Sequence, residues 1–353
     1  MPQDQNPATR AAVVILNYNG IHYLQKFFEQ IVQYSKPYEV WVADNASSDG
    51  SVNWLKEFYP DINLILIPEN KGYAGGYNYA LEQIDTPYYI LLNSDIEVTH
   101  DWIDPVLSFM ETDERIAACQ PKIRAYNNKE RFEYAGAAGG YMDFLGYPFT
   151  RGRIFDTCET DNGQFDDTAD VFWATGACLF LRSEAFRRMG GFDERFFAHM
   201  EEIDLCWRML DSGYRITYCG HSTVFHVGGG TLHKSNPQKT FLNYRNNLLM
   251  LYKNMPVGRR WKTILMRLVL DGISSVRFMA TGAWPDVWSI IRAHFAFYNL
   301  IPEFSKGLKR TTYRAPLYYK SVVWEYFVNG NHTYKELPGI KDNSEKEIRT
   351  PIL

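Results

Sequence analysis

The sequence has few cysteines, no long uncharged apolar run and no leader-like start. Its five cysteines form an odd set without CxxC spacing, which indicates a reducing compartment and argues against a disulfide framework or a zinc cluster. No apolar run reaches the ~18 residues that a membrane-spanning helix needs. The opening residues, MPQDQNPATR, lack the basic and apolar regions of a secretory leader, so we expect a cytoplasmic protein.

Two common nucleotide-binding motifs are also missing. A dinucleotide-binding Rossmann domain carries GxGxxG directly after its first strand, whereas this chain has LNYNG at that point. The P-loop motif, GxxxxGK followed by Ser or Thr, does not occur. These absences disfavour NAD binding and exclude a P-loop nucleotidase.

The N-terminal part of the chain alternates short apolar runs with helical patterns. The runs expected to form buried strands cover residues 11–16, 38–43, 63–67 and 88–92. Apolar residues recur at helical spacing over 21–34, and further helices are expected up to Phe58 and near Ile84. This rhythm predicts an α/β fold with a mostly parallel, doubly wound sheet.

Each predicted strand ends in a polar loop. The loops begin at Asn17, Asp44, Asn70 and Asn93. Because the carboxyl ends of parallel strands meet at one edge of a sheet, we expect a polar crevice there. Asp95, in the last of these loops, then lies where a cation or a nucleotide binds; the alternative is that its loop is only a turn.

Several motifs, in order and in register, resemble the family 2 glycosyltransferases with the GT-A fold. They are VVILNYNG, VADNASSDGS, NKGYAGGYNYAL, ILLNSDIEV, WATGACLFLR, GGFDERFF, MEEIDLCWRMLDSGYRI and TVFHVGGGTL. Within the family the chain is most similar to bacterial rhamnosyltransferase-like members that act on cell-surface polysaccharides. The resemblance implies a GT-A catalytic domain over 1–238, with a nucleotide-sugar half at about 11–123 and an acceptor half at about 124–238.

The resemblance also implies a site for Mn²⁺ or Mg²⁺. Transfer from a nucleotide-sugar releases a diphosphate, whose developing charge a divalent cation stabilises. In the family the last carboxylate of a DxD-type motif binds the metal, and it matches Asp95; Asn93 replaces the first acid, which leaves fewer protein ligands. A histidine at the exit of the final strand is a second ligand in some members and matches His226. The alternative for His226 is a hydrogen-bonded histidine beside a glycine turn.

The acceptor hydroxyl must lose its proton as it attacks, and a nearby carboxylate can accept that proton. The resemblance assigns this role to Glu202, where Asp is more usual, with Glu201 and Asp204 as the other candidates. Alternatively, the three acids only complement the dipole at the start of a helix.

Donor-binding residues follow from the loops and from the family, in which the first two loops line the nucleotide pocket. Glycine at position 72 permits close backbone approach. The expected donor-binding set is Asn17, Asp44, Asn70, Gly72, Asn78, Asn93 and Asp95. The donor would carry UDP or dTDP.

Residues 124–172 match no single element and form either a functional loop or a separate hairpin layer. In the family this region covers the donor and shapes the acceptor side. A strand-like stretch begins with Trp173 and Gly176, which we place on the acceptor side. The indole of Trp173 can stack on a sugar face, and packing in the core is the alternative.

Residues 239–330 form a basic amphipathic region, followed by a C-terminal tail at 331–353. Positions 241–330 hold 13 Lys and Arg against 4 Asp and Glu, although the whole chain has a net charge of −4. Helices with apolar stripes are expected at about 241–252, 261–276 and 284–297. Such a region suits the inner face of a membrane, where a lipid-linked acceptor is found; packing onto the catalytic domain and a dimer contact are alternatives. Nucleic acid is disfavoured as a partner.

Three functions are therefore compared. The first is an inverting, metal-dependent glycosyltransferase that acts on a hydroxyl of a cell-surface glycan or a lipid-linked saccharide. The second is a nucleotidyltransferase that makes a nucleotide-sugar, which calls for a basic first loop that LNYNG does not provide. The third is a non-catalytic glycan-binding protein, which absence of Asp95 or Glu202 would favour; both are present.

Overall fold

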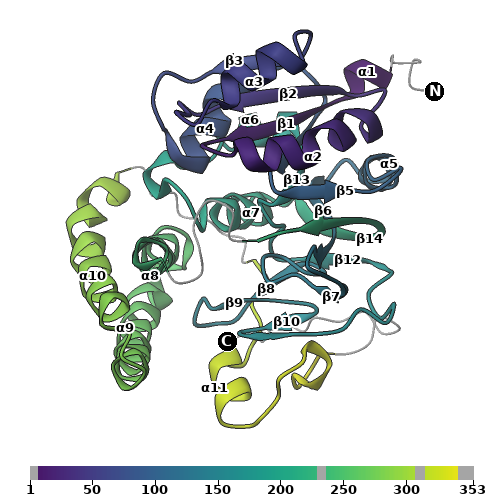
Figure 1. Cartoon of the computed structure of the whole chain (residues 1–353). Coiled ribbons are helices and arrows are strands. Elements are labelled where there is room, and N and C mark those ends of the chain that lie inside the picture. Colours follow the sequence, from purple (N-terminus) through teal and green to yellow (C-terminus); the bar gives the residue numbers. More distant parts are fainter. Residues whose placement is uncertain (1–6, 229–235, 307–314, 341–353) are drawn as a thin grey trace.

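The computed structural model describes residues 7–228, 236–306 and 315–340. A large mixed sheet runs through the molecule, and a smaller four-stranded sheet lies beyond one end of it (Figure 1). Three long helices, α8, α9 and α10, are grouped on one side. They are α8 (Pro237–Asn254), α9 (Val257–Ala280) and α10 (Trp284–Ser305). Residues 341–353 of the predicted tail lie outside the described residues.

The N-terminal half of the large sheet is parallel. Its strands are β1 (Ala11–Asn17), β2 (Glu39–Asp44), β3 (Asn63–Leu66) and β4 (Tyr88–Asn93), in the order β4-β1-β2-β3. The helices between them are α2 (Ile21–Tyr34), α3 (Ser51–Phe58) and α4 (Gly72–Leu81). This confirms the predicted α/β class and the parallel pairing of the first strands.

Both faces of these strands are covered, which explains their unbroken apolar runs. In β1, Val13 and Ile15 pack with α2 and α3 on one face, while Ala12 and Val14 pack with α4 on the other. All four side chains are fully buried. The polar residues begin only where each strand extends beyond the helices that cover both faces. The crevice therefore lies at the carboxyl edge of the sheet.

The second half of the sheet runs partly antiparallel. It contains β5 (Ile96–Val98), β6 (Ile116–Ala125), β7 (Asn128–Phe132), β12 (Thr168–Val171), β13 (Cys178–Arg182) and β14 (Arg215–His226). Strand β13 is antiparallel to β4 and starts where β4 ends, with Cys178 opposite Leu92. Strand β5 pairs with the end of β14, with Ile96 opposite His226. The loop after β4 is therefore enclosed by the start of β13 and the end of β14.

The region that matched no single element is a layer of short hairpins. The small sheet is formed by β8 (Gly140–Met142), β9 (Pro148–Thr150), β10 (Arg153–Ile154) and β11 (Thr157–Cys158). Of the two alternatives for 124–172, the structure has the hairpin layer. The short helix α11 (Val322–Phe327) packs against it through Tyr326, whose ring lies 5.0 Å from that of Phe155.

The remaining helices connect the two halves. They are α1 (Pro7–Arg10), α5 (Asp104–Glu111), α6 (Ser183–Arg188) and α7 (Glu201–Asp211). Helix α8 packs against α7, α9 and α10 and so joins the helical region to the sheet domain. Over the described part of the chain, every helix is too short or too polar to cross a membrane.

Candidate active site

The first two polar loops hold each other at the edge of the sheet. Asn17 and Asp44 are paired in register, and Asn17 Nδ2 donates to Asp44 Oδ2 at 2.9 Å. The other Asp44 oxygen accepts from the backbone N–H of Ser47 at 2.9 Å. Asn17 Oδ1 is buried and has no hydrogen-bond partner among the described residues. The two predicted donor-binding residues thus lie together, with one free acceptor between them.

The third loop is organised by Asn45, which the sequence analysis did not single out. Its amide donates to Asn70 Oδ1 at 3.1 Å and to the carbonyl of Gly72 at 3.0 Å, and its oxygen accepts from the backbone of Lys71 at 2.9 Å. Asn70 also accepts from the Gly72 N–H at 2.9 Å. Asn70 lies at the expected edge, where its oxygen shapes the loop.

The structure shows contacts within the chain for Gly72 and Asn78, whose donor contacts stay predictions. Gly72 has a φ of +67°, and a Cβ there would lie 2.4 Å from the carbonyl oxygen of Phe197, so this glycine leaves room for that carbonyl. Asn78 donates to the carbonyl of Phe192 at 2.9 Å and accepts from its N–H at 3.0 Å. The side chain of Asn78 therefore holds the segment before α7.

The fourth loop brings Asp95 and His226 together, as the resemblance implied. Asp95 Oδ1 lies 3.2 Å from His226 Nε2, and His226 Nδ1 lies 3.2 Å from Glu133 Oε2. All three side chains are buried. Burial alone would lower the pKa of His226, but the charges of Asp95 and Glu133 raise that pKa to about 10. Burial opposes ionisation of the two acids, and the charge of His226 nevertheless lowers the pKa of each.

This arrangement fits a divalent cation that protein and donor bind jointly. Neighbouring ligands of an octahedral ion lie about 3 Å apart when each bond is ~2.1 Å long, close to the separation of Asp95 and His226. Two buried carboxylates around one imidazole also favour positive charge at this point. Within the described ranges, no cluster of three or more His, Cys, Asp or Glu could hold a metal by itself.

A short chain of contacts joins this loop to the start of α7. The backbone N–H of Asn93 donates to the carbonyl of Ala177 at 3.0 Å. The hydroxyl of Tyr73 donates to the carbonyl of Gly176 at 2.8 Å, and a Cβ on Gly176 would lie 2.6 Å from that hydroxyl oxygen. Burial, followed by the charges of neighbouring residues that include Glu201 and Glu202, raises the pKa of Tyr73. Tyr73 therefore lies between this loop and the acids of α7.

Glu201 and Glu202 stand at the first turn of α7 in a largely enclosed setting. Each has a buried Oε2 atom without a hydrogen-bond partner among the described residues. Burial raises the pKa of Glu202 to about 7. Burial, followed by the charge of Glu202, raises the pKa of Glu201 well above its usual range. Acids that only complemented a helix dipole would stay ionised, whereas a carboxylate that titrates near neutrality suits a general base.

Asp204, the third candidate base, has a different role. Its carboxylate accepts from Arg208 Nε at 2.8 Å, Lys253 Nζ at 2.9 Å and Asn254 Nδ2 at 2.8 Å. Burial would raise the pKa of Asp204, but Lys253 and Arg208 lower it. Because both oxygens are engaged by partners on α7 and α8, Asp204 ties these helices together and does not fit the role of a base.

Trp173 packs in the core, which is the alternative that the sequence left open, and its place on the acceptor side stays a prediction. The side chain is only 4 % exposed, and its Nε1 donates to the carbonyl of Tyr141 at 2.9 Å. The indole lies against Gly140, where a Cβ would come within 2.0 Å of the ring. These contacts favour core packing over stacking on a sugar.

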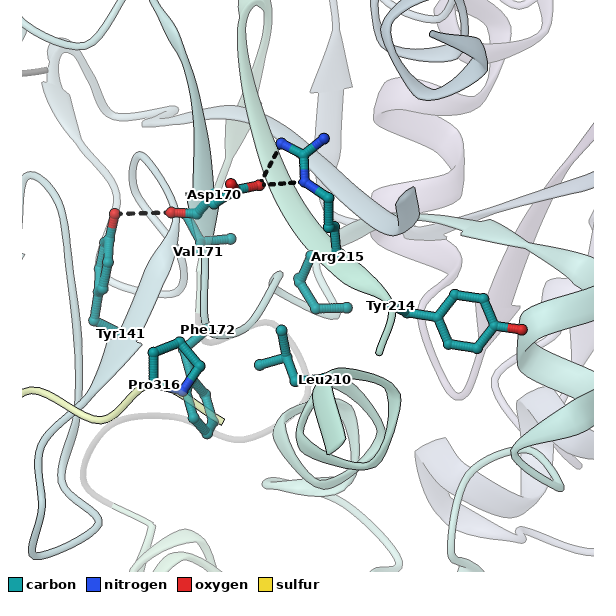
Figure 2. A pocket seen from close by; sticks show the side chains of 9 residues that line it. Tyr141, Asp170, Val171, Phe172, Leu210, Tyr214, Arg215 and Pro316 are labelled. Atoms are coloured by element: carbon teal, nitrogen blue, oxygen red, sulfur yellow. Dashed lines mark hydrogen bonds and ion pairs between the residues drawn. The ribbon is translucent and has the colours of Figure 1, made fainter. Parts of the chain in front are cut away.

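A pocket of about 150 Å³ lies elsewhere and does not belong to this site (Figure 2). It is next to Leu210, about 12 Å along α7 from Glu202. Its polar groups already pair with each other, since Arg215 binds Asp170 at 2.7 Å and Tyr141 donates to the Asp170 carbonyl at 3.1 Å. We therefore assign no ligand to it.

Comparisons with known proteins point to one family. The sequence model of Glycosyl transferase family 2 matches residues 12–190. The N-acetylglucosaminyl-diphospho-decaprenol L-rhamnosyltransferase of Mycobacterium tuberculosis is 28% identical over 233 residues, which cover 61% of this chain and 75% of that protein. Rhamnosyltransferase WbbL of Escherichia coli is 25% identical over 273 residues, which cover 75% of this chain and 98% of WbbL.

Two solved structures share the fold. GalNAc-T7 with UDP, GalNAc and Mn²⁺ has a TM-score of 0.56 at 15% identity, covering 70% of this chain and 48% of that one, so this chain spans about half its length. The mannosyltransferase PcManGT from Pyrobaculum calidifontis, with GDP-Man and Mn²⁺, has a TM-score of 0.51 at 17% identity, covering 84% and 90%. These likenesses confirm the GT-A fold.

The core position of Trp173 can be tested with Trp173→Phe. The smaller ring leaves a void and an unpaired Tyr141 carbonyl, so the free energy of unfolding should fall by about 1–3 kcal/mol in urea denaturation. Trp288→Phe, at a side chain 61% exposed, is the control and should change stability little. Unchanged stability of Trp173→Phe, together with a weaker affinity for saccharides, would support stacking on a sugar instead.

Proposed function

Because this chain belongs to glycosyl transferase family 2 and is a glycosyltransferase, we propose that it is an inverting, divalent-metal-dependent member of that family. The donor is a UDP- or dTDP-linked sugar, with rhamnose favoured by the names of the two relatives. The acceptor is a hydroxyl of a cell-surface glycan or of a lipid-linked saccharide. The observation that carries this proposal is the 3.2 Å contact of Asp95 with His226 at the carboxyl edge of the sheet, together with the enclosed carboxyl group of Glu202 at the start of α7.

On the donor side, Asp95 and His226 would hold Mn²⁺ or Mg²⁺, which neutralises the charge that develops on the leaving diphosphate. Glu133 orients the imidazole through its other nitrogen, as carboxylates commonly do for histidine ligands. The absence of a third protein ligand makes the metal site dependent on the donor. Donor and cation are therefore expected to bind together.

The nucleotide lies over the first polar loops, next to Asn17 and Asp44. Asn17 is fully buried, and its Oδ1 lies against Gly20, where a Cβ would come within 2.5 Å of it. Asn17 therefore supports the pocket by holding Asp44 in place. Asn70 and Asn93 complete the rim of this pocket through the loops that they shape.

On the acceptor side, Glu202 is the general base. The acceptor oxygen attacks the anomeric carbon as the bond from that carbon to the diphosphate oxygen breaks, and the hydroxyl proton passes to Glu202. A single displacement of this kind inverts the configuration at the anomeric carbon. Burial keeps the pKa of Glu202 above its usual range, and burial, followed by the charge of Glu202, raises the pKa of Glu201 beside it.

We also propose that α9 and α10 bind the anionic inner face of a membrane, where a lipid-linked acceptor is held. The predicted apolar stripe divides in the structure: Ile264 is buried, whereas other members face outward. The side chains more than half exposed on these two helices are Val257, Trp261, Leu265, Val269, Ile273, Val276, Trp284, Trp288 and Phe295. Arg259, Arg260 and Lys262 lie in the first two turns of α9, next to the exposed Trp261, and basic residues there suit anionic headgroups.

Asp95 and Glu202 should fail in different ways when replaced. Asp95→Ala should weaken Mn²⁺-dependent binding of UDP or dTDP, measured by calorimetry, because a ligand of the cation is lost. Glu202→Gln should spare that binding but lower the rate of nucleotide release from a donor panel by about 10²–10⁴-fold. Asp61→Ala and Glu57→Gln, at exposed sites, are controls. Full transfer activity in either site variant would contradict the assignment.

The pKa of Glu202, raised by burial to about 7, predicts a pH dependence. The base must be ionised, so kcat/KM should rise with pH and level off above about pH 7. Between the ordinary pKa of 4.5 and about 7, the folded protein binds the extra proton, and stability should fall as pH rises through this window.

Glu202→Gln should therefore stabilise the protein at pH 8, by at most about 3 kcal/mol, and change its stability little at pH 4.5. Thermal unfolding at the two pH values measures this difference. A variant that is equally stable relative to wild type at both pH values would show that Glu202 has an ordinary pKa.

Membrane binding can be tested with the full chain and charge-introducing substitutions. Leu265→Asp with Ile273→Asp should reduce flotation with phosphatidylglycerol-containing liposomes at least tenfold, because both side chains lie on the exposed face. Phe58→Asp, an exposed apolar position on α3, is the matched control and should float like wild type. Equal flotation of the double variant would exclude this surface, and a change from dimer to monomer would identify it as a dimer contact.

A further inference from the structure

The segment that leads into α7 has an unusual backbone. Phe197, His199 and Met200 have φ angles of 66°, 70° and 75°, in the left-handed region that residues other than glycine rarely adopt. Met200 directly precedes Glu201, and its carbonyl accepts the first helical hydrogen bond of α7, from Asp204 N at 2.8 Å. Such a conformation persists only where the surroundings hold it. The direction in which α7 starts therefore depends on contacts from outside this segment.

Helix α8 supplies those contacts through Asn246. Its Nδ2 lies 2.9 Å from the carbonyl oxygen of Phe196, 2.8 Å from that of Ala198 and 2.8 Å from that of His199. Its Oδ1 accepts from Arg245 Nε at 2.8 Å, and the same guanidinium donates to Phe196 O at 2.9 Å. Asn246 is fully buried. One side-chain amide thus contacts three backbone carbonyl groups of this segment, all of which face α8.

The other side of the segment rests on the donor half. The backbone N–H of Ala74 donates to the Phe197 carbonyl at 3.2 Å, and Gly72 leaves room for that carbonyl. Residues 196–200 are therefore held between α4, which follows the third polar loop, and α8. Removal of the α8 contacts would free one side only, so the segment could relax while the fold remains.

We propose that Asn246 is a positioning residue for glycosyl transfer, which fixes residues 196–200 and thereby the place of the Glu202 carboxylate at the first turn of α7. This inference rests on the proposed role of Glu202 as the base. It gives the C-terminal helical region a part in the active site that is separate from its exposed face. The effect is large because catalysis depends steeply on distance: a displacement of ~1 Å can cost about 10²-fold in rate.

The next residue of α8 provides a matched control. Asn247 is also buried, and its Nδ2 donates to the carbonyl of Gly146 at 2.9 Å. That carbonyl belongs to the hairpin layer and also accepts from Arg267 at 3.0 Å. Asn246→Ala and Asn247→Ala each remove one buried amide from the same helix, but only the first faces the segment before Glu202.

The experiment compares both variants in the full chain. With a UDP- or dTDP-sugar that wild type uses, Asn246→Ala should lower kcat for nucleotide release about 10²-fold while the KM for the donor stays within twofold. Hydrogen–deuterium exchange should increase over 196–204. Asn247→Ala should keep the wild-type kcat and the wild-type exchange over 196–204. Asn246→Ser, which retains one donor, replaces the alanine variant if circular dichroism shows that the latter is unfolded.

Three results would overturn the inference: a wild-type kcat in the Asn246 variants, an equal loss of kcat in Asn247→Ala, or an unchanged exchange rate over 196–204. Failure of the proposed function itself is distinguishable, because wild type would then release no nucleotide from any donor. The exchange measurement would in that case still show whether Asn246 holds the segment.

Discussion

The contact between Asp95 and His226 links the two halves of the sheet at its carboxyl edge, where the candidate active site lies. It joins the end of β4, in the parallel half, to the end of β14, in the antiparallel half, and the pairing of β5 with β14 fixes its register. Glu133 adds a second carboxylate from the hairpin side. Three parts of the chain far apart in sequence are thus brought to one charged point at the carboxyl edge of the sheet.

The opposite side of the crevice combines two unfavourable features. Glu202 is a carboxylate whose pKa burial raises to about 7, and the segment before it adopts positive φ angles. Neither feature helps the chain fold, whereas under the proposed function both serve a base that must meet an acceptor at a fixed place. Two sets of contacts attach α7 and the segment before it to α8 and offset this cost. They are the ion pairs of Asp204 with Arg208 and Lys253, and the hydrogen bonds of Asn246.

The parallel half of the fold could be predicted from the sequence because its strands are buried on both faces and end in polar loops. The bounds of α2 and the end of α3 agree with prediction to the residue. Residues 124–172 left two alternatives open, since short strands with exposed faces carry weak periodicity. The proximity of Asp95 and His226 followed from the resemblance, because no pattern within one segment indicates which distant strand lies alongside.

Three residues make contacts that the sequence did not predict, for a common reason. Trp173, Asn78 and Gly72 were judged by residue type, yet their partners are set by tertiary packing: Tyr141, Phe192 and Phe197 respectively. Glu133 and Asn246 lie in segments without a recognisable motif. A signal for Asn246 does exist, because two adjacent asparagines inside an apolar helix have poor helix propensity and must be compensated by specific hydrogen bonds.

The most direct test of the central claim is a crystal structure with UDP or dTDP and Mn²⁺, using anomalous scattering to locate the ion. We predict a manganese peak within ligand distance of Asp95, His226 and the diphosphate, with Glu202 facing the space beyond the phosphate. A peak bound elsewhere, or a diphosphate far from the end of β4, would contradict the claim.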